Sequence, residues 1–370
     1  MKIILDPQIF NAQKFGGISR YYSEIYNHLS NTEGIKINLP LSYSENLHIK
    51  KTVCRIHWFY NFLISINFFK NKIIRKLKRR DSKLVIKTLL NKNYDLLIPS
   101  YYDPYFVEYI GDKPFVLTIY DMIHEIFPEY FTNDLITVKF KKELIEKAKI
   151  IIAISESTKR DILKIYPYIN GSKIEIVYLS HSIKIDEKVN ISLPDKYILF
   201  VGNRSIYKNF IFFLKSVAPI LINDSSLYIV CAGGDKFNDE EIKLIEDLNI
   251  ISQIIQQNFE DYELASYYSN ARCFVFPSEY EGFGIPVLES MACGCPVILA
   301  NHSSFPEVAG NAGIYFELNN GADLRSKIEN LLEVEELRSK YIDKGFEQVK
   351  KFSWEKTTKE CLKVYRKAII

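Results

Sequence analysis

The chain has 370 residues, enough for two domains of ordinary size. Hydrophobic residues make up 47% and charged residues 25%, a balance that excludes a disordered chain, a collagen-like repeat and a small disulfide scaffold. The net charge is +3, yet residues 50–80 contain ten basic side chains and no acidic one, so the rest of the chain is net acidic.

The six cysteines form no CxxC pair, which favours a reducing compartment over a disulfide framework or a zinc site. Asp6 arrives too early for a signal peptide, and no apolar run reaches the roughly 18 residues that a spanning helix needs. We therefore expect a cytoplasmic protein.

Short apolar runs alternate with amphipathic segments along the whole chain. The strands predicted in the first half are 3–5, 96–98, 115–119, 150–154 and 174–177, and those in the second half are 197–201, 227–231, 251–255, 273–276 and 297–300. Helical segments separate most of them, for example 134–147, 208–221, 239–248 and 321–333. Many of these strands are continuously apolar, as parallel strands buried on both faces are. The order predicts an α/β protein with two Rossmann-like, doubly wound domains that face a cleft.

A polar stretch between His181 and Tyr197 separates the two series of strands. We predict an N-terminal domain over residues 1–185 and a C-terminal domain over residues 190–351. Residues 352–370 read as one more amphipathic helix, which we expect to pack back on the N-terminal domain.

Two candidate sites lie in the N-terminal domain. Gly16 and Gly17 come directly before the first helix, where paired glycines make a turn that accommodates an anion, although ordinary turns use them too. Asp121 and His124 follow the strand 115–119, at the edge of the sheet where open α/β folds bind ligands. A lone histidine is more often structural, so residue types alone leave its role open.

Apolar and basic blocks alternate within the basic segment 50–80. Such a segment can lie in a membrane interface, with its aromatic side chains buried and its cations toward anionic headgroups. Nucleic acid is a competing partner, and a partly buried helix with one solvated cationic face is the structural alternative.

Arg204 and Lys208 follow the first strand of the C-terminal domain. Two cations four residues apart at a strand end suit a diphosphate, since arginine binds phosphate as a planar fork and lysine as a point charge. Solvated surface cations are the alternative for two basic residues taken alone.

The most informative stretch is Ser278–Gly294, which follows the strand 273–276 and leads into a helix. Gly282 and Gly284 let the backbone approach a ligand closely, and Pro286 suits the first helical position. Glu281 and Glu289 stand beside this helix start, and carboxylates in such a place can accept hydrogen bonds from sugar or ribose hydroxyls. Helix-start acids stabilised by the helix dipole are the alternative.

The spacing of Glu281 and Glu289 in this setting resembles the signature of the retaining nucleotide-sugar glycosyltransferases of glycosyltransferase family 4. Segments on either side resemble the family too, namely residues 260–264, 296–298 and 305–308. The resemblance extends over nearly all the chain and is weakest between about residues 45 and 93. It implies the GT-B fold, with an acceptor-side N-terminal domain and a C-terminal domain that binds the nucleotide sugar.

The resemblance also implies roles for the candidate residues. Glu281 would contact donor sugar hydroxyls and Glu289 the ribose. The backbone of the segment 283–285 would lie against the sugar and phosphate; its residues are Phe283, Gly284 and Ile285. Arg204 and Lys208 would neutralise the leaving diphosphate, with the loop of Gly16 and Gly17 against it. His124 would lie near the reacting sugar, and Asp121 would support its loop.

The chain contains no Asp-x-Asp pair, the usual ligand set for a divalent ion on a nucleotide diphosphate. We therefore expect metal-independent transfer without a cofactor, the two cations supplying the charge neutralisation. The sequence predicts a retaining hexosyltransferase of surface polysaccharide or lipopolysaccharide synthesis, using a UDP- or GDP-linked sugar and a glycan or lipid-linked acceptor. It is expected to be cytoplasmic, peripheral on the inner membrane face through residues 50–80, and without a nucleic-acid partner. The alternative is a non-catalytic nucleotide- or sugar-binding protein on the same fold.

Overall fold

The computed structural model describes residues 1–41, 43–49, 70–132, 134–185, 189 and 191–370. The chain divides into two compact units. The N-terminal unit comprises Met1–Ile154, Thr158–Leu179 and Trp354–Ile370, and the C-terminal unit comprises Ser155–Ser157 and Ser180–Ser353. Apart from Ser155–Ser157, the chain passes from the N-terminal unit to the C-terminal unit at residues 179–180. The boundary predicted from the sequence lies at residues 185–190.

Parallel strands form the centre of the N-terminal unit. One sheet has the order β2-β1-β3 and the other the order β4-β5-β6, and a parallel bridge from Leu97 to Phe115 joins β3 to the start of β4. The strands are β1 (Lys2–Leu5), β2 (Lys36–Asn38), β3 (Leu96–Ile98), β4 (Val116–Ile119), β5 (Ile150–Ala153) and β6 (Ile174–Ile176). Residues of β3, β4 and β5 are buried throughout, in agreement with their continuously apolar sequences.

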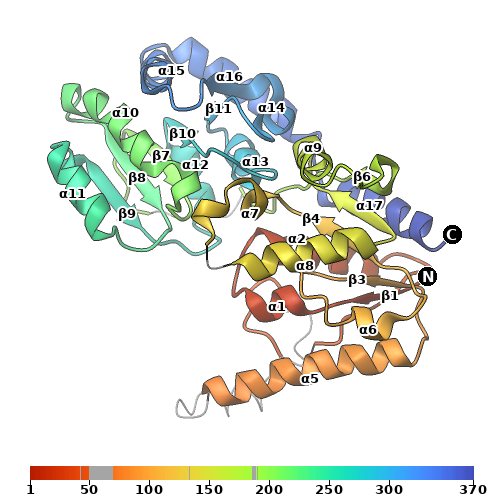
Figure 1. The fold of residues 1–370 in the computed structure, drawn as a ribbon. Coiled ribbons are helices and arrows are strands. Elements are labelled where there is room, and N and C mark those ends of the chain that lie inside the picture. The colour runs from red at the N-terminus through yellow and green to blue at the C-terminus, as the bar shows by residue number, and fades with distance from the viewer. Residues whose placement is uncertain (42, 50–69, 133, 186–188, 190) are drawn as a thin grey trace. The chain divides into compact units, whose positions relative to one another are not determined.

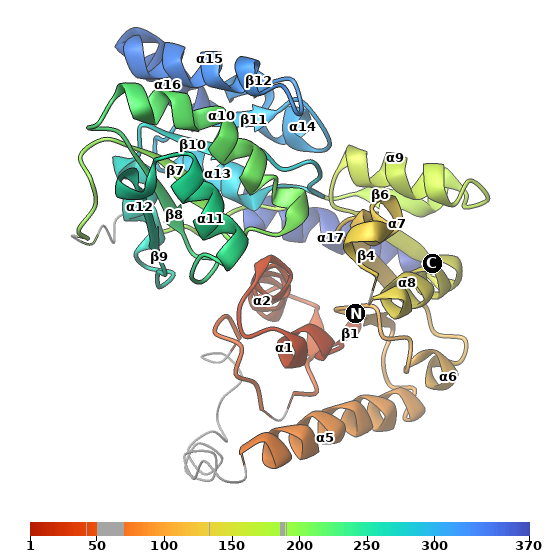
Figure 2. The ribbon, with the colours of Figure 1, turned by 60° about the vertical axis from the view of Figure 1, so that its left-hand side comes forward.

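Helices cover these strands, and one of them comes from the far end of the chain. They are α1 (Gln8–Ala12), α2 (Gly17–Ser30), α5 (Lys70–Leu90), α6 (Val107–Ile110), α7 (Ile123–Ile126), α8 (Leu135–Lys147), α9 (Glu156–Ile165) and α17 (Trp354–Ala368). The last of these packs against α2, where the hydroxyl of Tyr21 lies 3.3 Å from the Sγ atom of Cys361. Figure 2 shows α5 as a long helix on the outside of the unit, next to α6.

The C-terminal unit contains one six-stranded parallel sheet with the order β12-β11-β10-β7-β8-β9. Its strands are β7 (Tyr197–Val201), β8 (Tyr228–Ala232), β9 (Ile254–Gln257), β10 (Cys273–Phe276), β11 (Val297–Ala300) and β12 (Gly313–Phe316). The direction of winding reverses between β7 and β10, which are hydrogen-bonded neighbours. Ligands of doubly wound folds bind at such a reversal, beyond the carboxyl ends of the strands.

Helices cover both faces of this sheet, with α10 beside α15 and α13 beside α12 and α16 (Figure 1). The helices are α10 (Phe210–Asn223), α11 (Asp239–Asp247), α12 (Leu264–Asn270), α13 (Ile285–Ala292), α14 (Phe305–Ala309), α15 (Gly321–Glu333) and α16 (Glu335–Val349). Short 3-10 turns add Pro128–Tyr130, Gly171–Lys173, Ile206–Lys208, Ile251–Gln253 and Gly310–Ala312. The predicted α/β class with Rossmann-like, doubly wound sheets is confirmed.

Two predictions at the level of elements need correction. The strand expected at residues 251–255 begins only at Ile254, because Ile251–Gln253 forms a 3-10 turn that leads into β9. The edge strands β2 and β12 were not predicted from the sequence. β2 has one apolar residue among three, so it lacks the apolar run on which the other strands were recognised.

Candidate functional site

The candidate site of the C-terminal unit is built by the two loops at the reversal of the sheet. One loop follows β7 and contains the turn Ile206–Lys208, and the other follows β10 and runs to the start of α13. A backbone hydrogen bond joins them, from the N–H of Glu279 to the carbonyl of Tyr207 at 2.8 Å. The two loops therefore form one continuous surface at the carboxyl edge of β7 and β10.

Lys208 and Glu281 form an ion pair between these loops. Their side chains are 13% and 15% exposed, so both remain within reach of a bound molecule. The Lys208 ammonium group also lies over the ring of Phe276, 4.7 Å from its centroid. A cation that can bind phosphate and a carboxylate that can accept hydroxyl hydrogen bonds thus lie in direct contact.

Two serines of the following connection hold the backbone of the Glu281 loop. The hydroxyl of Ser303 donates to the carbonyl of Glu281 at 2.6 Å and accepts from its N–H at 3.1 Å. The hydroxyl of Ser304 lies 2.8 Å from the same carbonyl and 3.0 Å from the carbonyl of Phe283. The segment 281–283 is therefore bound to the loop that follows β11.

The start of α13 follows at once. Gly284 has a φ of +91°, and a Cβ atom there would lie 3.2 Å from the ring of Phe305, so a glycine suits this turn. The side chain of Phe283 is buried, and Pro286 stands at the helix start. The structure thus leaves the backbone of residues 283–285, rather than the side chain of Phe283, as the part that can face a ligand.

Glu289 lies one turn further along α13 and is buried. The hydroxyl of Tyr268, from α12, donates to its Oε2 atom at 3.4 Å. Burial, with Glu289 nearby, raises the pKa of Tyr268 well above its ordinary value, so the phenol stays protonated and can donate. Tyr268 therefore fixes the orientation of the Glu289 carboxylate.

The Arg204 side chain makes contacts that the sequence did not suggest. Its guanidinium pairs with Glu241 at 2.8 Å, and it donates to the backbone carbonyls of Gly233, Asp235 and Lys236. The side chains of Arg204 and Glu241 are 4% and 5% exposed. Three hydrogen bonds of the guanidinium therefore hold the loop after β8, and a fourth binds Glu241 in α11. Of the two cations expected at the diphosphate, Lys208 pairs with Glu281 and Arg204 with Glu241, and the catalytic role of each stays a prediction.

The predicted residues of the N-terminal unit lie beyond the ends of β1 and β4. Gly16 precedes α2 and Gly17 begins it, and a Cβ atom on Gly16 would lie 2.7 Å from the Oε1 atom of Gln13. The hydroxyl of Ser19 donates back to the carbonyl of Gly16 at 3.0 Å, which closes the turn. Gly16 has a φ of +158°, which residues with a side chain seldom adopt, so glycine suits this turn.

His124 lies in α7, where its Nε2 atom is 3.2 Å from Asp134 and its ring packs on Phe131. Asp121 accepts the N–H of Ile123 at 3.1 Å, so it stabilises the start of the same helix. The buried Lys141 of α8 donates to the backbone carbonyl of Asp121 at 3.2 Å. Asp121 thus stabilises the helix that carries His124, and the roles predicted for both residues at the site stay predictions.

The glycosyl transferases group 1 family matches residues 182–348, which contain all the geometry of the C-terminal unit described above. Residues 182–348 are a group 1 glycosyltransferase domain. The O-antigen chain mannosyltransferase B of Escherichia coli is 27% identical to the chain over 289 residues, 74% of each protein. A Campylobacter jejuni N-acetylgalactosaminyltransferase that acts on a diphospho-undecaprenol glycan is 28% identical over 62% of this chain and 64% of its own length.

Among solved structures, the Anabaena protein HepE in complex with UDP and glucose superimposes with a TM-score of 0.69. It is 15% identical, and the match covers 99% of each chain. This likeness shows the shared fold, which is the GT-B fold expected from the sequence. The fold expected when the sequence motifs were interpreted is therefore the fold that the structure has.

Four residues of the glycosyltransferase domain that shape its site were missed from the sequence: Glu241, Tyr268, Ser303 and Ser304. Only the two serines carried a usable signal, because they immediately precede the segment 305–308 that resembles the family. Glu241 and Tyr268 lie 37 and 21 residues from their partners, and nothing in the local pattern connects them.

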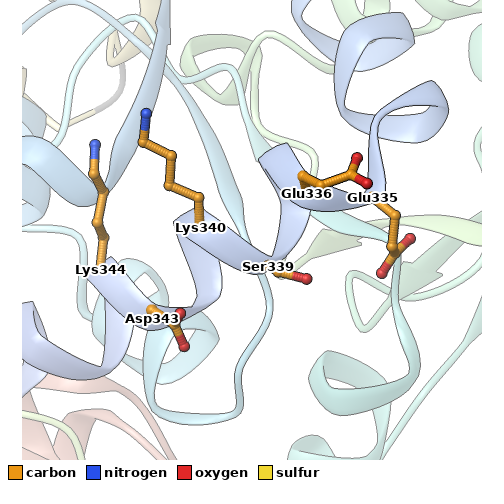
Figure 3. A pocket seen from close by; sticks show the side chains of 6 residues that line it. All are labelled: Glu335, Glu336, Ser339, Lys340, Asp343 and Lys344. Atoms are coloured by element: carbon orange, nitrogen blue, oxygen red, sulfur yellow. The ribbon is translucent and has the colours of Figure 1, made fainter.

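A shallow hollow on α16 lies apart from these loops. Figure 3 shows the side chains that line it, which come from one helix and mix both signs of charge: Glu335, Glu336, Ser339, Lys340, Asp343 and Lys344. Such a mixed, single-helix surface is typical of a solvated face. Among the described residues, no cluster of His, Cys, Asp or Glu side chains has the makings of a metal site.

The basic segment 50–80 lies in large part outside the described residues. The structure begins to describe the chain again at α5, whose sequence carries the basic residues from Lys70 onward. Within the described part of the chain, no helix has both the length and the apolar character to cross a bilayer.

Proposed function

We propose that this protein transfers a hexose from a UDP- or GDP-linked sugar to a glycan or lipid-linked acceptor, with retention and without a metal ion. The observation that carries this proposal is the contact of Lys208 with Glu281 at the reversal of the sheet. A leaving diphosphate needs a cation, and a donor sugar needs an acceptor for its hydroxyls. One pair of side chains offers both in one place.

The proposed reaction follows from these two groups. The bond between the anomeric carbon and the diphosphate oxygen breaks, and its electron pair stays on the diphosphate beside Lys208. The acceptor oxygen bonds to the anomeric carbon on the same face, and its proton passes to the departing phosphate oxygen. Glu281 orients the sugar through its hydroxyls and forms no covalent bond. Stabilising the departing charge is the main contribution of the protein.

The place of this reaction in surface polysaccharide or lipopolysaccharide synthesis is supported by two relatives. One is named as an O-antigen chain mannosyltransferase, and the other acts on a glycan linked to diphospho-undecaprenol. We propose an acceptor of the same class, a growing glycan carried on a lipid. The N-terminal unit, with His124 and the turn at Gly16 and Gly17, would serve this acceptor and the donor diphosphate.

A donor screen tests the proposal. UDP-glucose, UDP-N-acetylgalactosamine and GDP-mannose are each incubated with the protein and a lipid-linked glycan, with and without EDTA. We expect one donor to be consumed at the same rate in EDTA, and NMR of the product to show the anomeric configuration of the donor. An inverted centre would refute the mechanism, and loss of rate in EDTA would refute metal independence.

Thermal shifts with UDP, GDP and ADP separate the two candidate functions. A ligand raises the melting temperature only if it binds the native state better than the unfolded one. We expect UDP or GDP to stabilise the protein and a matching sugar nucleotide to be turned over. Stabilisation by a nucleotide without turnover of any donor would favour the non-catalytic alternative on the same fold.

We also propose peripheral binding to an anionic membrane through the segment 50–80. Basic residues are attracted to anionic lipid headgroups, so the strength of binding should depend on the anionic lipid content of the vesicles. Co-sedimentation with vesicles that contain phosphatidylglycerol should be strong and should disappear with neutral vesicles. Equal binding to both would contradict this part of the proposal.

A further inference from the structure

The hydroxyls of Ser303 and Ser304 hydrogen-bond to the backbone of the loop that carries Glu281. Ser303 donates to the Glu281 carbonyl and accepts from the Glu281 N–H, and Ser304 contacts the carbonyls of Glu281 and Phe283. Both serines lie in the connection after β11, a different part of the chain from the loop they bind. The backbone of Glu281 is therefore fixed by side chains 22 and 23 residues away.

The burial of this contact makes it hard to replace. Ser304 is fully buried, and Ser303 has a φ of +57°, a backbone conformation that residues other than glycine seldom adopt. Buried carbonyls need donors, and the contact of Ser304 with the Phe283 carbonyl is buried. The left-handed conformation of Ser303 holds its hydroxyl where it reaches both the N–H and the carbonyl of Glu281.

These contacts fix the backbone of Glu281, and a different contact holds its carboxylate. The carboxylate pairs with Lys208 in the loop after β7, and the backbone is bound by the serines after β11. Glu281 is thus held from two directions by neighbouring connections at the same edge of the sheet. Catalysis by orientation depends on such support, because a displacement of about 1 Å can reduce a rate about a hundredfold.

We propose that Ser303 and Ser304 are positioning residues that set the place of the Glu281 carboxylate against the donor sugar. This inference rests on the proposed function, since it assigns the serines to the same site. They act through Glu281 and need not touch the substrate. Their loss should affect steps that involve the sugar and spare the binding of the nucleotide alone.

A double-mutant cycle with Glu281→Gln tests this role. Ser304→Ala and Ser303→Ala should each lower kcat about tenfold, while the Kd for free UDP or GDP changes less than about twofold. In the Glu281→Gln background, the same serine substitutions should change kcat less than about twofold, because the group that they position is already disabled. An undiminished tenfold loss in that background, or a parallel loss of nucleotide affinity, would overturn the proposal.

Ser216→Ala is the matched control. Ser216 is also a buried serine of the C-terminal unit. Its hydroxyl donates to the carbonyl of Phe212, in the same helix α10, at 2.7 Å. It should leave kcat unchanged within about twofold. A similar loss of kcat in this variant would show that any buried serine of the unit has the effect.

Hydrogen exchange followed by mass spectrometry tests the contact without any need for activity. In Ser303→Ala the Glu281 N–H loses its acceptor, so peptides that cover residues 279–284 should exchange about tenfold faster while those from β8 do not. Unchanged exchange would overturn the inference even in an inactive protein. Faster exchange in a protein that consumes no donor would instead contradict the proposed function alone.

Discussion

The Nζ atom of Lys208 and the Oε1 atom of Glu281 share a hydrogen bond across 73 residues of chain. In the structure the two groups pair with each other. A bound donor brings a diphosphate, which competes for the lysine, and sugar hydroxyls, which compete for the carboxylate. In the proposed reaction, donor binding would exchange this internal ion pair for two contacts with the substrate. Each residue can be tested by the effect of its removal.

Loss of Lys208 should slow transfer through the leaving group. In Lys208→Gln the departing diphosphate has no cation at this position, so kcat should fall on the order of a hundredfold. The Kd for UDP or GDP, measured by calorimetry, should rise as well. Lys215→Gln, which removes an exposed lysine from the nearby α10, should change neither quantity. Equal effects in the two variants would show that only net charge matters.

Loss of the carboxylate should act in the opposite direction on nucleotide binding. In Glu281→Gln the lysine no longer has a competing anion, so free UDP or GDP should bind about three- to tenfold more tightly. At the same time kcat should fall about a hundredfold because the sugar loses its orienting group. Calorimetry and steady-state kinetics on one preparation measure both. Weaker binding of the free nucleotide would contradict the competition that the ion pair implies.

The strand ends that carry the site could be predicted from sequence, and the partners of their side chains could not. The runs 197–201 and 273–276 are continuously apolar, and the helix starts after them have glycine and proline signals, so the location of the two loops followed from local pattern. The parallel order that makes β7 and β10 neighbours follows from the doubly wound architecture. Local chemistry and topology thus fix where the site lies.

Arg204 and Lys208 show where such reasoning stops. They are four residues apart and equally basic, yet one is turned into a buried pair with Glu241 and the other faces Glu281. The choice depends on α11, whose capping box at Asn238 places Glu241 near the loop after β8. Because this contact spans 37 residues and has no local signature, the sequence pattern treats the two cations alike.

The Arg204 pair should therefore matter for stability. In Arg204→Met the buried carboxylate of Glu241 loses its partner, so the free energy of unfolding should fall by about 3–5 kcal/mol. Replacing both residues, as Met at 204 and Leu at 241, should recover much of this loss because no unpaired charge remains. Urea denaturation of both variants measures this. A large loss of kcat in Arg204→Met with unchanged stability would instead support the catalytic role predicted from the sequence.

Alanine in place of Gly234 should destabilise the protein more than alanine in place of Gly34. The two have φ values of +78° and +75°, but a Cβ on Gly234 would lie 2.6 Å from the carbonyl of Gly202, whereas nothing lies within 4 Å at Gly34. Gly34→Ala should cost about 1 kcal/mol, the strain of the left-handed conformation alone. Gly234→Ala should cost about 2 kcal/mol more, since the loop after β8 must also move. Equal losses of unfolding free energy in the two variants would show that the loop after β8 can move at no energetic cost.

Asp6 should make stability depend on pH. It is fully buried at the end of β1, where the N–H of Gln8 donates to it at 3.0 Å, and burial raises its pKa from 3.8 to about 6. Between about pH 4 and pH 6 the unfolded chain releases this proton while the native protein keeps it. The contribution of Asp6 to the free energy of unfolding therefore falls as the pH rises through this interval and is constant above it.

Asp6→Asn isolates this contribution, because asparagine keeps an oxygen for the Gln8 N–H and carries no charge. At pH 7 the variant should be more stable than the natural protein by up to about 3 kcal/mol, and near pH 4 the difference should approach zero. Urea denaturation of both proteins at intervals between pH 4 and pH 7 measures the difference directly. A difference that does not change with pH would mean that Asp6 has the same proton affinity in the native and unfolded chains.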